Sequence, residues 1–373
     1  MKSIYKYALW GAAVCLIAII IFWILGSINL LGPFLILFFL LLSVGFRGHK
    51  FLKGLSFTVL ILASVSAAMF YPAFFLKQGN FELRNLIVPL LQIIMFGMGT
   101  TMSLSDFAGV IKMPKGVVVG LLCQFSIMPI VGFSIAKLFG FPPEIAAGVV
   151  LIGSSPSGLA SNVMTYLAKA NLALSVTLTA VATLMAPLMT PMLMQVFAGQ
   201  LVPINFLDMM MNIIEMVIVP IVAGLVFNHF FHGKVPWLDR AMPILSMAGI
   251  AIIITIITAL GRDNLLEIGA ALIVAAIIHN LLGYFFGYWG CRFLRLPERD
   301  CRTIALEVGM QNGGLASALA ERMGMAATAG LAPAIFGPWM NISGSSLATW
   351  WGERDPEAKK KTETPVAVEQ ESA

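Results

Sequence analysis

The feature that most constrains this fold is a series of about twelve long apolar stretches, which follow one another along almost the whole chain. A helix needs about 20 apolar residues to cross the hydrocarbon core of a bilayer, and most of these stretches approach or exceed that length. We therefore expect an all-α polytopic membrane protein. The stretches cover residues 7–28, 30–46, 54–76, 85–104, 116–139, 145–168, 172–199, 206–231, 240–260, 266–294, 302–322 and 326–351.

Composition supports the same conclusion. Of the 373 residues, 59% are apolar and only 11% are charged, whereas a soluble domain carries about 25% charged residues. The net charge of +5 fits basic residues at membrane boundaries, with lipid as the surrounding partner and no nucleic acid. No ATP-binding loop, zinc-protease motif or serine-hydrolase motif occurs, so we predict no enzyme. The four cysteines have no metal-ligand spacing, and we expect four free thiols.

The distribution of basic residues predicts the orientation in the membrane. With the N-terminus in the cytoplasm and alternating spans, 18 of the 23 Lys and Arg residues lie on the cytoplasmic side, which also places the C-terminus there. Residues 352–373 are polar and are expected to form a disordered cytoplasmic tail. The first apolar run is too long for a cleaved signal peptide, so we expect a retained helix. A bacterial inner membrane is the simplest location.

An internal repeat divides most of the chain. The sequence GLAS at Gly158 to Ser161 recurs 156 residues later at Gly314 to Ser317, and the same offset places Gln124 on Asn280. Because each half would contain five spans, an odd number, the two halves would have opposite orientations. Inverted repeats of this kind are typical of secondary transporters.

The repeats are expected to cover about residues 52–200 and 206–351, each with five spans, within a transporter unit of residues 51–351. Residues 1–50 would add two N-terminal transmembrane helices. Each repeat contains one span with a polar, glycine-rich centre, GSSPSGLASN from Gly153 and EVGMQNGGLAS from Glu307. Such breaks free backbone groups, which are tolerated only inside protein or beside a cavity. We therefore predict two broken helices that cross at a binding site.

Glu307 is the strongest candidate for a functional residue. A carboxylate deep within a span is costly and usually marks an ion site. Oxygen-bearing side chains surround it in the sequence pattern, namely those of Ser161, Asn162, Gln311 and Asn312. Hard oxygen ligands around a single carboxylate suit sodium, because calcium and magnesium prefer more negative charge. The alternative is a protonated Glu that makes hydrogen bonds between helices.

Other polar residues in the spans have weaker signals. Ser175 and Thr179 share one helix face, so they could join the same site or pack between helices. Gln124 is explained equally well by an interhelical hydrogen bond. We interpret Glu215 as a packing or subunit-contact residue and His279 as structural. Arg302, at the end of its span, can extend to water.

Several long motifs identify a family resemblance. The chain resembles the bile acid:sodium symporter (BASS) family over about residues 52–351. The motifs that carry this resemblance are MFGMGTTMSLSDF from Met95, SNVMTYLA from Ser161, ALSVTLT from Ala173, EVGMQNGGLA from Glu307 and NISGS from Asn341. The resemblance implies a ten-helix fold with a panel domain and a core domain.

The resemblance also implies two sodium sites beside the crossing helices. The first would be formed by Ser161, Asn162, Ser175, Thr179 and Glu307. The second would be formed by Gln124, Glu307, Val308, Met310 and Gln311, in which Val308 and Met310 offer main-chain carbonyls. The substrate is expected between core and panel, near Asn312 and Asn341.

Two departures from the family pattern lie at the expected substrate site. Family members often carry Pro-Gly-Gly-Thr where this chain has Pro156 to Leu159, and a His where it has Met340. The expected function is sodium-coupled symport of an organic anion, either a bile-acid-like steroid or a smaller carboxylate such as pantothenate or a keto acid. A proton-coupled carrier and a non-transporting membrane receptor are the alternatives. Oligomeric state is not predicted.

Overall fold

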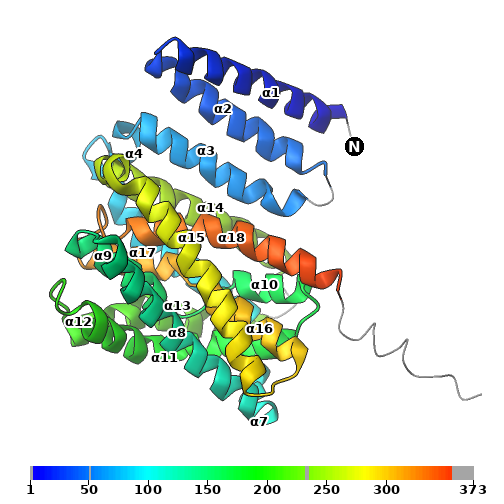
Figure 1. Ribbon diagram of the computed structural model, residues 1–373. Coiled ribbons are helices and arrows are strands. Elements are labelled where there is room, and N and C mark those ends of the chain that lie inside the picture. Colours follow the sequence, from blue (N-terminus) through cyan, green and yellow to red (C-terminus); the bar gives the residue numbers. More distant parts are fainter. Residues whose placement is uncertain (1–2, 50–51, 232–234, 355–373) are drawn as a thin grey trace, which may run out of the picture.

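The computed structural model describes residues 3–49, 52–231 and 235–354, and Figure 1 shows a bundle of helices. Each of the twelve predicted windows contains one helix or one interrupted helix. The uninterrupted ones are α1 (Ser3–Ile24), α2 (Ile28–Phe46), α3 (Ser56–Phe70), α5 (Ile87–Thr101), α8 (Pro114–Phe139), α11 (Leu172–Ala198), α14 (Pro236–Leu260), α15 (Arg262–Phe293) and α18 (Leu331–Gly352).

Three windows contain interrupted helices. Two of them are the predicted broken segments, and the third changes to a π-helix in its middle. They are α9 (Pro143–Ser154) with α10 (Ala160–Leu167), α16 (Glu298–Gly309) with α17 (Gly313–Arg322), and α12 (Phe206–Ile213) with η3 (Ile214–Ile218) and α13 (Val219–Phe231).

Short elements connect the long helices. They include a two-stranded antiparallel hairpin, which the all-α expectation did not contain. Pro72 follows the end of α3, and Gly79 adopts a positive φ of 60° in the turn between the strands. Runs of two residues are too short to give a strand pattern. The short elements are η1 (Lys53–Leu55), α4 (Ala73–Leu76), β1 (Lys77–Gln78), β2 (Phe81–Glu82), η2 (Leu83–Leu86), α6 (Leu104–Phe107) and α7 (Gly109–Lys112).

Within the described residues, eight helices are long and apolar enough to cross a membrane, counting α12 to α13 as one. The buried core lies among α5, α8, α9, α11 and α14 to α18. The outward faces of the long helices remain apolar, with exposed residues such as Leu122, Val196 and Phe285. Such faces are compatible only with lipid, because a soluble monomer rarely exposes large contiguous apolar patches.

The first two helices form a layer on one side of the molecule. Helix α1 packs against α2, and α2 packs against α3, as Figure 1 shows in blue and cyan. Ser43 and Ser56 each donate a hydroxyl hydrogen bond of 2.8 Å to the other's carbonyl, and Arg47 donates to the Ser56 hydroxyl at 3.2 Å. These contacts fix the start of α3. Of the predicted tail 352–373, residues 355–373 lie outside the described residues.

Candidate functional site

The two broken helices cross through their backbones. The Gly158 N–H donates to the Met310 carbonyl at 2.9 Å, and the Asn312 N–H donates to the Pro156 carbonyl at 2.8 Å. Ser157 and Gln311 face each other as an antiparallel bridge. A side chain at Gly158 would bring a Cβ within 3.1 Å of the Gln311 carbonyl, which explains the glycine. Each break therefore satisfies freed backbone groups of the other.

Glu307 lies near the end of α16, beside this crossing, and is 2% exposed. Three hydroxyl groups converge on its carboxylate. Ser161 of α10 donates at 2.5 Å, and Ser175 and Thr179 of α11 donate at 2.6 Å and 2.9 Å. No basic side chain among the described residues forms an ion pair with Glu307. A carboxylate can be buried in this way only if hydrogen bonds, a proton or a bound cation stabilise it.

The oxygens of this cluster outnumber the hydrogens available to them. The Ser161 hydroxyl also lies 2.8 Å from the Gly158 carbonyl. The hydroxyls of Ser175 and Thr179 lie 2.8 Å and 3.3 Å from Oδ1 of Asn162. Each of these three hydroxyls has one hydrogen and approaches two acceptors. Oxygens packed together with too few hydrogens are the donor set that a hard cation uses.

A second polar cluster lies at the same crossing. Gln124 of α8 donates through Nε2 to the Ser155 carbonyl at 3.1 Å and to Oε1 of Gln311 at 2.8 Å. Gln311 donates in turn to the Val308 carbonyl at 2.6 Å. The Oε1 atom of Gln124 is buried and has no hydrogen-bond partner among the described residues. An unpaired buried oxygen is an acceptor available to a ligand.

A cavity of about 340 Å³ opens beside the crossing, between α3, α5 and α14 on one side and α10, α17 and α18 on the other. Most of its lining is apolar, including Leu91, Met95 and Ile254, and the lining within the described residues contains no charged side chain. The helices α10 and α17 both begin at this cavity. All four residues expected near a substrate line it, namely Leu159, Asn312, Met340 and Asn341.

Comparison with known proteins assigns the chain to a family. A model of the sodium bile acid symporter family matches residues 88–268. The uncharacterized sodium-dependent transporter YocS of Bacillus subtilis is 38% identical over 308 residues, which are 83% of this chain and 93% of that protein. The chain belongs to the sodium bile acid symporter family. The predicted resemblance is thus confirmed.

Plant relatives extend the same family. The probable sodium/metabolite cotransporter BASS1 of Arabidopsis thaliana chloroplasts is 36% identical and covers 74% of this chain and 69% of its own length. Its counterpart in Oryza sativa is 32% identical, with 82% and 74% covered. These names describe sodium-dependent transporters. With eight membrane-length helices in the part of the chain that the structure describes, this family member is a multi-pass membrane protein.

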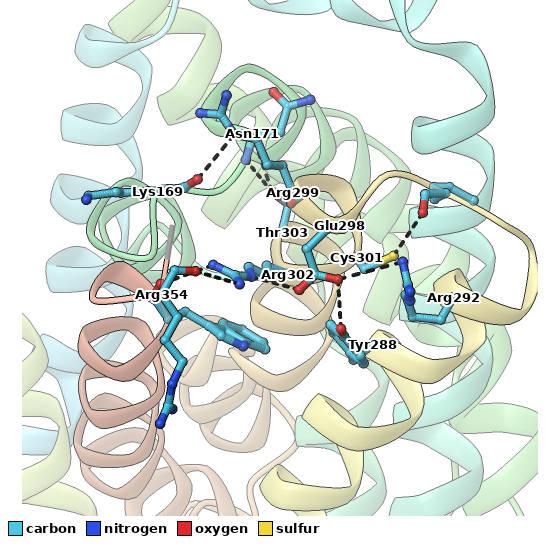
Figure 2. A network of polar contacts seen from close by, with 12 residues as sticks. Lys169, Asn171, Tyr288, Arg292, Glu298, Arg299, Cys301, Arg302, Thr303 and Arg354 are labelled. Atoms are coloured by element: carbon cyan, nitrogen blue, oxygen red, sulfur yellow. Dashed lines mark hydrogen bonds and ion pairs between the residues drawn. The ribbon is translucent and has the colours of Figure 1, made fainter. Parts of the chain in front are cut away.

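One expectation about this symporter family member is wrong. Arg302 was expected to extend to water, but it is only 6% exposed and lies inside the network drawn in Figure 2. Its guanidinium donates to Glu298 at 2.9 Å and to the carbonyls of Trp351 and Arg354 at 3.0 and 2.9 Å. The Trp351 carbonyl lies in the last turn of α18 and also accepts the Arg354 N–H at 3.0 Å, and Arg354 follows the helix. The buried guanidinium therefore ties the C-terminal end of α18 to α16.

The same network holds the connection between α10 and α11. Asn171 donates to the Asp300 carboxylate at 2.8 Å, and its N–H donates to the Thr303 hydroxyl at 2.9 Å. Arg299 donates to the Lys169 carbonyl at 3.2 Å, as Figure 2 shows. No local pattern predicted these contacts, because their partners lie about 130 residues apart in the chain.

Glu215 and His279, two further ionisable residues in the spans, differ in exposure and in partners. The side chain of Glu215 is 57% exposed, and its carboxylate lies 3.8 Å from the guanidinium of Arg322 at the end of α17. Sequence reasoning missed this partner. His279 is buried, and its Nε2 lies 2.9 Å from the Met128 carbonyl. This contact fits the structural role expected for it.

Proposed function

We propose that this protein is a sodium-coupled symporter of an organic anion that works by alternating access. The observation that carries the proposal is the buried Glu307 carboxylate, which receives three hydroxyls and forms no ion pair among the described residues. Relatives named as sodium-dependent transporters support the coupling ion. A cation bound here would neutralise the carboxylate and complete the oxygen cluster.

Two sodium ions fit the residues at the crossing. The first would use the carboxylate of Glu307 with the oxygens of Ser161, Asn162, Ser175 and Thr179. The second would use Glu307 again, with Oε1 of Gln124, a side-chain oxygen of Gln311 and the carbonyls of Val308 and Met310. One carboxylate and several neutral oxygens match the low charge of sodium better than that of calcium.

The cavity supports an amphipathic anionic substrate. Its apolar walls suit a hydrocarbon body, while the helices α10 and α17 direct their positive N-terminal ends toward it. Asn312 and Asn341 would contact the polar end of the substrate, and Leu159 and Met340 its apolar body. Sodium holds the two breaks in register, so sodium and anion would bind cooperatively. A bile-acid-like steroid and a smaller carboxylate such as pantothenate or a keto acid remain the substrate candidates.

Alternating access would involve two moving parts. Inverted repeats of about residues 52–200 and 206–351 would form a core domain around the crossing and a panel domain opposite it. Movement of the core against the panel would expose the cavity to each side in turn. Residues 1–50 would remain outside this unit, as an extra hairpin on the panel. The protein would lie in a bacterial inner membrane, with both termini in the cytoplasm.

A sodium titration of thermal stability tests this proposal. The purified protein in detergent is heated at increasing sodium concentrations, with choline keeping ionic strength constant. A ligand that binds only the folded state stabilises it by about 2.7 kcal/mol at 100 times its Kd. We expect sodium, and not potassium, to raise the melting temperature, and Glu307→Gln to abolish the rise.

Glu215→Gln is the matched control, because it removes an acid from another span and should keep the response. A sodium response that survives in Glu307→Gln would contradict the proposed site. If the wild-type protein shows no response to sodium but responds to pH through Glu307, the carrier is proton-coupled instead.

A further inference from the structure

Asn280 is a buried amide for which neither the proposed sodium sites nor the cavity provides a role. It lies in the middle of α15 and is 0% exposed. Its Nδ2 donates to the Gly309 carbonyl at 2.8 Å. Its Oδ1 accepts from the Ser343 hydroxyl of α18 at 2.6 Å, and the Tyr284 hydroxyl lies 3.2 Å from that of Ser343. Both ends of the amide are thus fixed.

The Gly309 carbonyl needs this donor because α16 ends there. In a continuous helix, the N–H of Gly313 would bond to this carbonyl. Here that N–H bonds to the Gln311 carbonyl at 3.0 Å instead. A buried carbonyl without a donor is costly in a membrane protein. Glycine at position 309 allows α15 to pack closely against the end of α16, because a Cβ there would overlap the ring of Tyr284.

The carbonyls on either side of Gly309 are those proposed to bind sodium. The Val308 carbonyl accepts from Gln311 at 2.6 Å, and the Met310 carbonyl accepts from the Gly158 N–H at 2.9 Å. Peptide groups are planar and joined at Cα atoms, so the bond to the Gly309 carbonyl fixes the peptide plane that lies between those of the Val308 and Met310 carbonyls. Asn280 thus holds the middle one of three consecutive carbonyls, while Gln311 and Gly158 hold the outer two.

We propose that Asn280 is a positioning residue for the second sodium site, holding the Gly309 carbonyl so that those of Val308 and Met310 face the ion. This inference rests on the proposed function. The same amide is tied through Ser343 to α18, which presents Met340 and Asn341 to the cavity. The cavity wall and the ion-facing carbonyls are consequently linked by two hydrogen bonds.

The first broken helix supports this role with a related contact. Gln124, which lies 156 residues before Asn280, donates its amide to the Ser155 carbonyl at 3.1 Å. Ser155 directly follows the end of α9. In each half of the chain, one buried amide from a long helix holds a carbonyl freed by the break. Gln124 is longer by one methylene and also donates to Gln311 in the other broken helix. Asn280 donates to Gly309, in the broken helix of its own half.

The test compares sodium titrations of Asn280→Asp and the wild-type protein, using sodium chloride alone as the probe and the melting temperature as the readout. Asp has nearly the same shape but directs oxygen rather than N–H toward the carbonyl. Loss of a group that orients metal ligands weakens metal affinity about 10- to 100-fold. We expect a rise of at least tenfold in half-saturating sodium and a Hill coefficient that falls toward that of a single site.

Asn264→Asp is the matched control, since Asn264 lies on the same helix and donates to the Ala327 carbonyl at 3.0 Å, away from the crossing. A purely structural role for Asn280 would lower the sodium-free melting temperature and leave half-saturation unchanged, which would overturn the inference. If Asn280→Asp does not fold, Ser343→Ala is tested in the same way, and half-saturating sodium should again rise, by less than the tenfold expected for Asn280→Asp. Absence of any wild-type sodium response would instead overturn the proposed function itself.

Discussion

The broken helices α9–α10 and α16–α17 have the same backbone layout and different side chains. Each begins after a proline, stops at a polar break and resumes near the sequence GLAS. The position of Glu307 in the second corresponds, 156 residues earlier, to Leu151 in the first. Asn162 in the first corresponds to Ala318 in the second. One copy therefore supplies the charge, and the other supplies neutral oxygens.

This difference teaches that similar backbones need not duplicate a site. The hydroxyls that contact Glu307 come from α10 and α11, so the charge of one half lies in the oxygen cluster of the other. Ser317, which corresponds to Ser161, lies on the wall of the cavity instead. At this cluster, each half therefore depends on the other.

The largest effect is expected from moving the charge to the other copy. Leu151 is 1% exposed, so Leu151→Glu would bury a carboxylate without the three hydroxyls that Glu307 has. An uncompensated buried charge destabilises a protein by about 3–5 kcal/mol. We expect little folded protein, measured as the monodisperse fraction in size-exclusion chromatography and as the melting temperature.

Two variants sharpen this prediction. Leu151→Met nearly conserves volume and should cost less than about 1.5 kcal/mol. Glu307→Leu removes the charge from the second copy and should fold but lose the sodium response. If Leu151→Glu folds and still binds sodium, then a buried carboxylate at this position does not need the hydroxyls that surround Glu307.

An intermediate effect is expected at the paired serines. Ser161→Ala removes the hydroxyl that lies 2.5 Å from the Glu307 carboxylate, and a hydrogen bond to a charged group contributes about 1.5–3 kcal/mol. Half-saturating sodium should rise about tenfold, since about 1.4 kcal/mol corresponds to that factor. Ser317→Ala should leave sodium affinity unchanged. Equal rises in half-saturating sodium in the two variants would contradict the proposed difference between the two copies.

The smallest effect is expected at the paired glycines. Gly158→Ala places a Cβ 3.1 Å from the Gln311 carbonyl, whereas the nearest atom at Gly314 is 3.4 Å away. Gly158→Ala should lower the melting temperature by a few degrees, or about 1 kcal/mol. Gly314→Ala should leave it unchanged or raise it slightly, because alanine favours the helix. The reverse order would indicate that the crossing tolerates a side chain.

The sequence predicted the elements whose signal is local. Apolar windows located the twelve helical stretches of the described residues, and the polar breaks located the crossing, because both signals are continuous in the chain. The cluster around Glu307 contains Ser161, Ser175 and Thr179 as expected, although the assignment of these residues to sodium remains a prediction. Periodicity alone left Ser175 and Thr179 undecided, since a hydroxyl on a helix face serves packing equally well.

Contacts between distant segments could not be predicted. Arg302 looked like a boundary residue because the carbonyls that bind it belong to Trp351 near the end of α18 and to Arg354 just after it, 49 and 52 residues later. Glu215 had no evident partner because Arg322 is brought near by the fold. The hairpin of β1 and β2 is too short for an alternating pattern. For Arg302 and Glu215, the missing information was which distant segments the fold brings together.

The uncharged lining of the cavity has a consequence for leakage. Among the described residues, no Lys or Arg on its wall could serve as a permanent counterion for an anion. An anion that arrived without sodium would meet only helix ends, whose attraction is modest and depends on their alignment. If the protein is the proposed sodium-coupled symporter of an organic anion, passage of the anion without sodium would be disfavoured, and the sodium gradient would not be dissipated by uncoupled leakage through the protein.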